Sequence, residues 1–164
     1  MRTAIGIFTM ILLLATTACK GKKDVVADQS SETTTSAPFE VIRYVKTPCF
    51  GTCPQFTMVI RSDGFAFYEG KMFVEMEGSW RGQWSQKQIE AVLMKAEEIG
   101  YTSLDPSYDN RFVTDLPSTT TVLTFDGEPK SVLNRYDGPK ELAQLYILID
   151  GIIEDVKWTQ DTDN

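Results

Sequence analysis

Residues 47–54 read TPCFGTCP, and the rest of the chain is arranged around this octapeptide. Cys49 and Cys53 are separated by three residues and flanked by two prolines, whose rings fix the backbone φ angle and stiffen the segment. A tight turn across residues 50–52, in which Gly51 is free to adopt positive φ, would bring the two Cβ atoms to about the 4 Å that a disulfide needs. Sequence typical of strands precedes and follows. The octapeptide is therefore interpreted as a turn between the first two strands of a sheet.

Three chemical states are open to Cys49 and Cys53: a structural disulfide, a redox or Cu(I)-binding dithiol, and two free thiols. A redox dithiol usually has C-x-x-C spacing at a helix N-terminus, where the dipole lowers the thiolate pKa. Here the spacing is C-x-x-x-C and strand-like sequence follows, which favours the disulfide. The string resembles the copper site of thioredoxin-like copper-delivery proteins, although that site also uses histidine and this chain has none. Because two thiolates can hold Cu(I), thiol-redox or Cu(I) handling stays an alternative function.

Residues 1–18 have the features of a secretory signal peptide: a positive start, a short charge-free apolar run and small residues before Cys19. The apolar run is too short to span a bilayer. The pattern resembles a bacterial lipobox, with Thr16 where leucine is usual. This resemblance implies cleavage before Cys19 and lipid attachment there. Lipidation also removes the odd thiol among three cysteines, leaving Cys49 and Cys53 to pair in an oxidising compartment.

Residues 19–38 are predicted to be the lipidated cysteine and a flexible tether. The segment is polar and rich in serine and threonine, so it cannot bury enough apolar surface to offset its chain entropy. As a coil it would reach roughly 25 Å. Lys20, which follows the cysteine, is not the aspartate that marks inner-membrane retention in some bacteria. The predicted location is therefore the cell envelope, on the periplasmic or surface side of the outer membrane.

Residues 39–157 are predicted to form one domain, followed by a polar tail at 158–164. Residues 39–164 contain 12 basic and 20 acidic side chains, a net charge of −8. Such a charge argues against nucleic acid as a partner, because nucleic-acid binding depends on basic side chains that neutralise phosphates. The chain is long enough to bury a hydrophobic core.

Alternating apolar residues and turn signals predict an α+β fold of order ββββ-α-ββ-α: an antiparallel sheet with both helices on one face. The strands are expected at residues 41–47, 56–61, 65–69, 72–77, 119–125 and 130–136. Ser85 and Gln88 predict a capping box that begins the first helix, and Gly100 is placed to end it. Pro139 is expected at the first position of the second helix. The turn between the third and fourth strands is expected at residues 69–71.

Four stretches together resemble an uncharacterised "domain of unknown function" family of bacterial lipoproteins. They are RYVKTPCFGTCPQF at 43–56, SDGFAFYEG at 62–70, VTDLPSTTT at 113–121 and the C-terminal helix. The resemblance covers roughly residues 39–153 and rests chiefly on the TPCFGTCP-type motif. Phe56 stands where the family commonly has tyrosine. The family implies no activity, substrate or catalytic residue.

The longest predicted loop, residues 101–117, contains the candidate binding residues Tyr108, Asp109, Arg111 and Asp115. No catalytic residue, cofactor or metal ligand is predicted, because the absence of histidine removes Ser-His-Asp, Cys-His and histidine–metal chemistry. Whether the protein is an enzyme stays open, with a non-catalytic role favoured. Two carboxylates, Glu75 and Glu77, and two indoles, Trp80 and Trp84, are assigned structural roles. The sequence predicts a module that is attached to the membrane through Cys19 and binds an envelope protein or wall component.

Overall fold

The computed structural model describes residues 37–162. The predicted signal peptide, Cys19 and nearly all of the predicted tether lie outside the described residues, as do residues 163–164. Within the described range the chain forms eight strands, two α-helices and one short 3-10 helix. Their bounds are β1 Glu40–Lys46, β2 Gln55–Arg61, β3 Phe65–Met72, β4 Gly78–Gln83, α1 Gln86–Glu98, η1 Tyr101–Ser103, β5 Ser107–Tyr108, β6 Thr119–Phe125, β7 Glu128–Asn134, α2 Glu141–Asp155 and β8 Thr159–Gln160.

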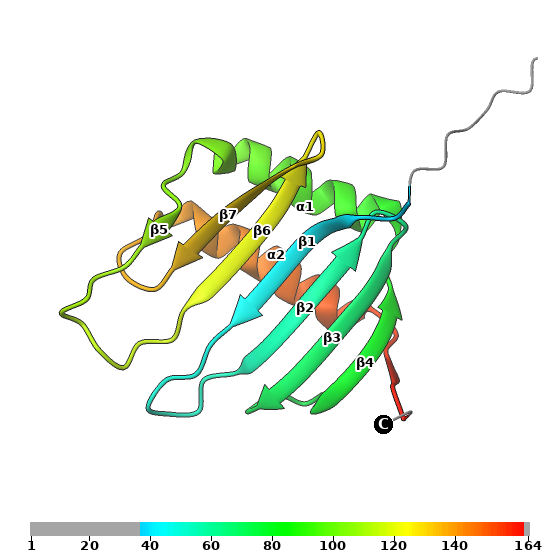
Figure 1. Cartoon of the computed structure of the whole chain (residues 1–164), viewed down its shortest axis with the longest axis horizontal. Helices are drawn as coiled ribbons and strands as arrows, with labels where there is room; N and C mark the ends of the chain where they lie inside the picture. Colours follow the sequence, from blue (N-terminus) through cyan, green and yellow to red (C-terminus); the bar gives the residue numbers. More distant parts are fainter. Residues whose placement is uncertain (1–36, 163–164) are drawn as a thin grey trace, which may run out of the picture. The chain divides into compact units, whose positions relative to one another are not determined.

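All the strands belong to one sheet with the order β5-β7-β6-β1-β2-β3-β4-β8. Every neighbouring pair is antiparallel except β5 and β7, which are parallel. Both helices lie on the same face of the sheet (Figure 1). The predicted fold class, an antiparallel α+β sheet with two helices on one face, is confirmed.

The core lies between this sheet face and the helices, and the period-two pattern of the strands creates it. Ile42 and Tyr44 of β1 and Met58 and Ile60 of β2 are fully buried and point toward the helices. The helices contribute apolar stripes that cover them: Ile89, Val92 and Ala96 from α1, and Leu142, Leu145, Ile149 and Ile152 from α2. Within the core, the Tyr101 hydroxyl lies 2.7 Å from Thr121 Oγ1 and 2.8 Å from the Thr121 carbonyl oxygen.

The predicted capping signals of α1 are confirmed. The Ser85 hydroxyl accepts a hydrogen bond from the Gln88 N–H, and the Gln88 side chain accepts one from the Ser85 N–H. Gly100 follows the helix with φ +68°, a left-handed conformation that glycine adopts without a Cβ clash. At the β6–β7 hairpin, Asp126 and Gly127 both have positive φ, as a type I′ turn requires.

The predicted fourth strand is wrong. Residues 73–76 form bends, β3 continues to Met72, and β4 begins at Gly78. The glycine that suggested a turn, Gly70, lies inside β3 because the loop folds back over it. A Cβ at Gly70 would lie only 1.8 Å from the Met76 carbonyl oxygen. Glycine within a strand marks this kind of close backbone approach.

Three smaller expectations also need correction. Gly51 does not adopt positive φ. Pro139 lies two residues before the start of α2, and its carbonyl accepts a hydrogen bond from the Leu142 N–H at 3.1 Å. The predicted polar tail is not wholly irregular, because Thr159 and Gln160 pair with β4. The ring of Trp158 packs on the core, which holds this segment in place.

Candidate functional site

Four connections gather at one end of the sheet, which we call the loop end (Figure 1). They are residues 47–54 between β1 and β2, 73–77 between β3 and β4, 109–118 between β5 and β6, and 135–140 between β7 and α2. The first described residues lead into the start of β1, at the opposite end of the sheet (Figure 1). The loop end is therefore separated by the length of the strands from the point where the preceding segment joins.

The loop end exposes large apolar side chains. Of the nine large hydrophobic residues that are exposed in the described range, five lie on these four connections: Phe50, Phe73, Phe112, Leu116 and Tyr136. Phe50 at the disulfide turn is 91% exposed and Phe112 is 80% exposed. Single exposed apolar residues are ordinary, but several on neighbouring loops mark an interaction surface.

The disulfide turn is held by its own disulfide and by hydrogen bonds on its N-terminal side. Cys49 and Cys53 are joined by a disulfide with Cα atoms 5.7 Å apart, so the prediction that they can pair is confirmed. Before the turn, the Thr47 N–H donates to the Ser118 carbonyl at 3.0 Å, and the Ser118 N–H donates to Thr47 Oγ1 at 2.8 Å. These bonds tie the disulfide turn to the end of the 109–118 loop. Phe50 is thus presented on a stiff support.

Arg135 fastens the other side of the 109–118 loop. Its guanidinium donates to Asp109 Oδ1 at 2.9 Å and to the Val113 carbonyl at 2.8 Å. The Tyr108 carbonyl accepts from the N–H groups of Arg135 and Tyr136 at 2.9 and 3.0 Å. The loop is therefore held against the β7–α2 connection, and Phe112 and Tyr136 lie on two connections that are hydrogen-bonded to one another.

The four candidate binding residues fall into two groups. Tyr108 and Asp109 are brought together, but as structural groups: the Tyr108 hydroxyl accepts from the Asp105 N–H, and Asp109 pairs with Arg135. Arg111 and Asp115 are exposed. The Arg111 guanidinium lies 4.8 Å from the centre of the Phe112 ring. Arg111 is thus the candidate that joins the exposed aromatic surface, and a binding role for the four residues stays a prediction.

A row of aromatic rings lies under the loop end, on the helix-facing side of the sheet. Tyr146, Tyr44, Phe56, Tyr68 and Trp158 follow one another with ring centres 5.9, 5.6, 5.0 and 5.7 Å apart. Such spacings are those of favourable aromatic pairs. Phe56, which stands where the family commonly has tyrosine, stacks on Tyr68 and is almost fully buried.

A half-buried ion pair accompanies this row. Lys46 Nζ lies 2.7 and 3.0 Å from the two carboxylate oxygens of Asp150 and 5.3 Å from the centre of the Tyr44 ring. The buried Tyr44 hydroxyl makes no hydrogen bond of normal geometry with any described group. Burial, and after it the Asp150 carboxylate, raise the pKa of Tyr44 above its usual value and raise the pKa of Tyr68 to about 12. Both phenols therefore stay protonated at neutral pH.

A groove of about 350 Å³ opens where the row ends. Its lining consists of Pro54, Tyr68, Phe73, Val74, Glu75, Met76, Ile153, Glu154 and Trp158. These residues come from the disulfide turn, β3, the 73–77 loop, the last turn of α2 and the segment after it. The groove thus joins the loop end to the C-terminal end of α2.

Two aromatic residues of this groove, Phe73 and Trp158, are not identified as site residues from the sequence. The sequence predicts a polar tail that includes Trp158 and a strand that includes Phe73. A tryptophan among polar residues was a usable signal, because so large an aromatic side chain is seldom left free in solvent. No signal marked Phe73, whose φ of +56° is rare for a bulky residue. Trp84 is buried in the core, as expected, and Trp80 packs against it.

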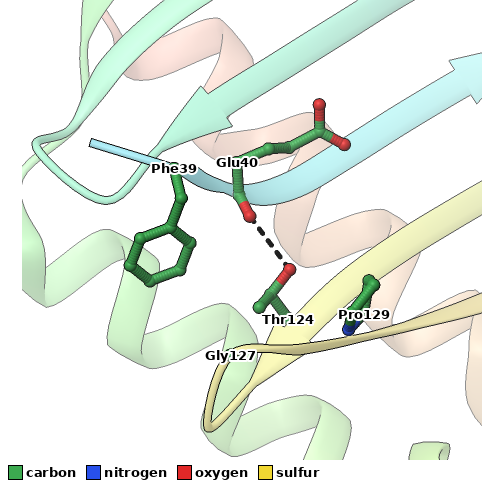
Figure 2. A pocket seen from close by; sticks show the side chains of 5 residues that line it. All are labelled: Phe39, Glu40, Thr124, Gly127 and Pro129. Atoms are coloured by element: carbon green, nitrogen blue, oxygen red, sulfur yellow. Dashed lines mark hydrogen bonds between the residues drawn. The ribbon is translucent and has the colours of Figure 1, made fainter. Parts of the chain in front are cut away.

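A second hollow, of about 330 Å³, lies at the opposite end of the sheet (Figure 2). Its lining is Phe39, Glu40, Thr124, Gly127 and Pro129. The Thr124 hydroxyl donates to the Glu40 carbonyl at 2.9 Å, and the Glu40 carboxylate points away from Thr124 (Figure 2). That carboxylate pairs with Arg43. Because its polar groups already bond to each other, this hollow offers little for a ligand to recognise.

The face of the sheet away from the helices has fewer groups free to contact a ligand than the loop end has. Its arginines are each paired with a neighbouring carboxylate: Arg43 with Glu40, Arg61 with Asp63, and Arg81 with Asp161. Within residues 37–162, Asp, Glu and Cys side chains nowhere form a group of three or more that could hold a metal ion. In the same range, no helix has the length and hydropathy needed to cross a membrane.

Residues 40–153 match the family described as Domain of unknown function (DUF6438). The chain belongs to this family. No curated protein matches the chain. The matched DUF6438 region contains all four connections of the loop end, whereas Glu154 and Trp158 of the groove lie beyond it. The expected membership of a family of unknown function is confirmed, and a lipoprotein character stays a prediction.

Proposed function

We propose that this protein is a non-catalytic binding module of the cell envelope, anchored through lipid on Cys19, that contacts an envelope protein or wall component with its loop end. The observation that carries the proposal is the exposure of Phe50, Phe112 and Tyr136 on loops that are braced by a disulfide and by hydrogen bonds. Aromatic anchors on rigid supports bind at a low cost in conformational entropy.

The chemistry of the site supports binding over catalysis. The buried phenols are held protonated, and the charged groups of the loop end are exposed or paired. The segment that carries Cys19 joins the domain at the end of the sheet opposite the loops, which leaves the loop end free of the point of attachment. An outer-membrane location is part of the proposal and rests on the sequence after Cys19.

Affinity capture from detergent-solubilised envelopes tests this proposal. The bait is the full chain, compared with a loop variant, Phe50→Ser with Phe112→Ser. The matched control is Met94→Ser with Ile147→Ser, which removes two exposed apolar residues from the helices (67% and 72% exposed). We expect the loop variant to lose proteins that wild type and control both retain. Equal recovery with all three baits would refute the loop end as the binding surface.

A second candidate function is thiol redox or Cu(I) handling by Cys49 and Cys53. The observation that favours it is that both cysteines are partly exposed. No described helix begins at the turn, so the dipole effect that lowers thiolate pKa values in redox motifs is missing there. The reduction potential separates the candidates: structural disulfides usually lie below about −300 mV, and labile ones lie above.

A further inference from the structure

The groove between the 73–77 loop and the end of α2 has a chemistry that the exposed phenylalanines do not share, because it combines aromatic walls with an acidic rim. We propose that it receives a lysine or arginine side chain from an extended segment of the partner protein. This inference rests on the proposed function and names the partner's chemistry at one part of the loop end.

The walls suit the stem and head of a basic side chain. Phe73, Tyr68 and Trp158 contribute rings, and Met76 and Ile153 add aliphatic surface. Lysine and arginine bury their methylene stems along apolar surface and keep the charged head near its edge. Cations are also attracted to the faces of aromatic rings, most strongly to tryptophan. An apolar ligand would use the same walls but would gain nothing from the rim.

The rim supplies uncompensated negative charge. Glu75 and Glu154 line the groove, and no basic residue does. Both carboxylates are exposed, and neither makes a hydrogen bond or ion pair with any group between residues 37 and 162. Elsewhere on the sheet the arginines are paired with carboxylates. The groove is therefore electrostatically complementary to a cation, and its two carboxylates have no ion-pair partner among the described residues.

The end of α2 adds to this field. The carbonyl end of a helix carries partial negative charge, and a basic residue in the last turn usually compensates it. The last turn of α2 has no basic residue and instead carries Glu154 and Asp155. The Trp158 indole N–H donates to the Ile153 carbonyl at 2.8 Å, which fixes the ring beside this turn. A bound cation would relieve the repulsion between the carboxylates and the helix end.

Lys157 is the basic residue next to Trp158 in sequence, and it is expected to compete with a bound cation for the carboxylates of the rim. Lys157 lies two residues after the end of α2; it is exposed and forms no ion pair with the described residues. It does not line the groove. Because a free lysine near the rim weakens the field that a ligand feels, Lys157→Gln is expected to tighten binding of a basic peptide.

Peptide titration by NMR tests the inference on the full chain in a nonionic maltoside detergent, which carries no competing cation. The probes are three short capped peptides of glycine and serine with a central lysine, norleucine or glutamate. The readout is the chemical shift of the Trp158 indole N–H, and the Trp84 indole in the core serves as the internal control. The lysine peptide is expected to shift Trp158 saturably and to lose affinity with added salt.

The variants separate the roles of charge and walls. We expect the norleucine peptide to bind at least about tenfold more weakly than the lysine peptide. The variant Glu75→Gln with Glu154→Gln should bind the lysine peptide about tenfold more weakly than wild type, and this binding should no longer depend on salt. Equal binding of lysine and norleucine peptides, or no lysine-dependent shift at millimolar concentration, overturns the inference. If it is overturned while the Phe50 and Phe112 variant still loses its partners in affinity capture, the proposed function survives without it.

Discussion

Gly51 and Gly70 both border the loop end, yet only one position requires glycine. A Cβ at Gly51 would lie 3.6 Å from Cys49 Sγ, an ordinary van der Waals contact, and φ is not positive there. A Cβ at Gly70 would lie 1.8 Å from the Met76 carbonyl oxygen. We expect Gly51→Ala to leave stability nearly unchanged and Gly70→Ala to lower it by about 1–3 kcal/mol, the usual cost of overpacking. Urea unfolding of the two variants measures this, and equal stabilities would contradict the close approach of the 73–77 loop.

Phe73 has a backbone conformation that costs free energy. Its φ of +56° is unfavourable for any residue with a Cβ, by roughly 1–2 kcal/mol. Phe73→Ala keeps this cost and loses the half-buried ring, whereas Phe73→Gly loses the ring but removes the cost. The glycine variant should therefore be more stable than the alanine variant, by about 1 kcal/mol. Denaturant midpoints test the difference, and an alanine variant at least as stable as glycine would show that Phe73 is unstrained.

The raised pKa values of the Tyr146 and Tyr68 phenols lead us to expect a loss of stability at alkaline pH. Burial raises the pKa of Tyr146 to about 12, and burial with the Asp150 charge does the same for Tyr68, while the unfolded value is about 10. A raised folded pKa means that the stabilisation is complete below pH 10 and is lost as the pH rises through about 12. Melting temperatures from pH 9 to 12 should fall, and less steeply in Tyr146→Phe. The exposed Tyr136→Phe is the control, and an identical profile for both variants would argue against the burial effect.

At the scale of elements, local signals that act within a few residues were readable from the sequence. The capping box at Ser85 and Gln88, the left-handed Gly100 and the Asp126-Gly127 turn each form as expected, because each depends on neighbours in the chain. The 73–77 loop and β8 depend on partners distant in sequence. Gly70 looked like a turn because the reason for a glycine there is the Met76 carbonyl, which is close only in the folded structure.

In the candidate site, too, features formed by sequence neighbours are predictable and features formed by distant segments are not. The pairing of Cys49 with Cys53 is predictable from the sequence because the second cysteine lies only four positions after the first. The groove is not, because its walls come from five segments between Pro54 and Trp158. The predicted loop at residues 101–117 is irregular only in part, because Tyr101–Ser103 form η1 and Ser107–Tyr108 form β5, which pairs with β7. The contacts of the Tyr108 carbonyl and of the Asp109 carboxylate depend on Arg135, which lies 27 and 26 positions later.

The disulfide turn is expected to act locally. A loop this short contributes about 2 kcal/mol in the chain-entropy account. Cys49→Ser with Cys53→Ser should therefore still fold, with a modestly lower melting temperature and faster amide exchange around residues 43–60. Hydrogen exchange read by mass spectrometry tests this. Two alkylatable thiols in protein taken directly from the envelope would contradict a structural disulfide.

For the whole molecule, we propose a binding domain at the end of a lipid-anchored tether. Cys19 is expected to carry the lipid that supplies membrane affinity. Cys19→Ala should abolish incorporation of a fatty-acid probe and release the protein from the membrane fraction or leave it as a precursor. Cys53→Ser is the control that keeps the label. Equal labelling of Cys19→Ala and wild type would contradict the lipoprotein assignment.

Site-specific photo-crosslinking in living cells tests the central claim, that the loop end is the surface that meets the partner. A photoreactive phenylalanine analogue is placed at Phe50, at Phe112 or at the exposed helix position Met94. We expect discrete cross-linked species that are shared by the two loop positions and absent from Met94. Adducts from Met94 that equal those from Phe50 and Phe112, or none from the two loop positions, would contradict it.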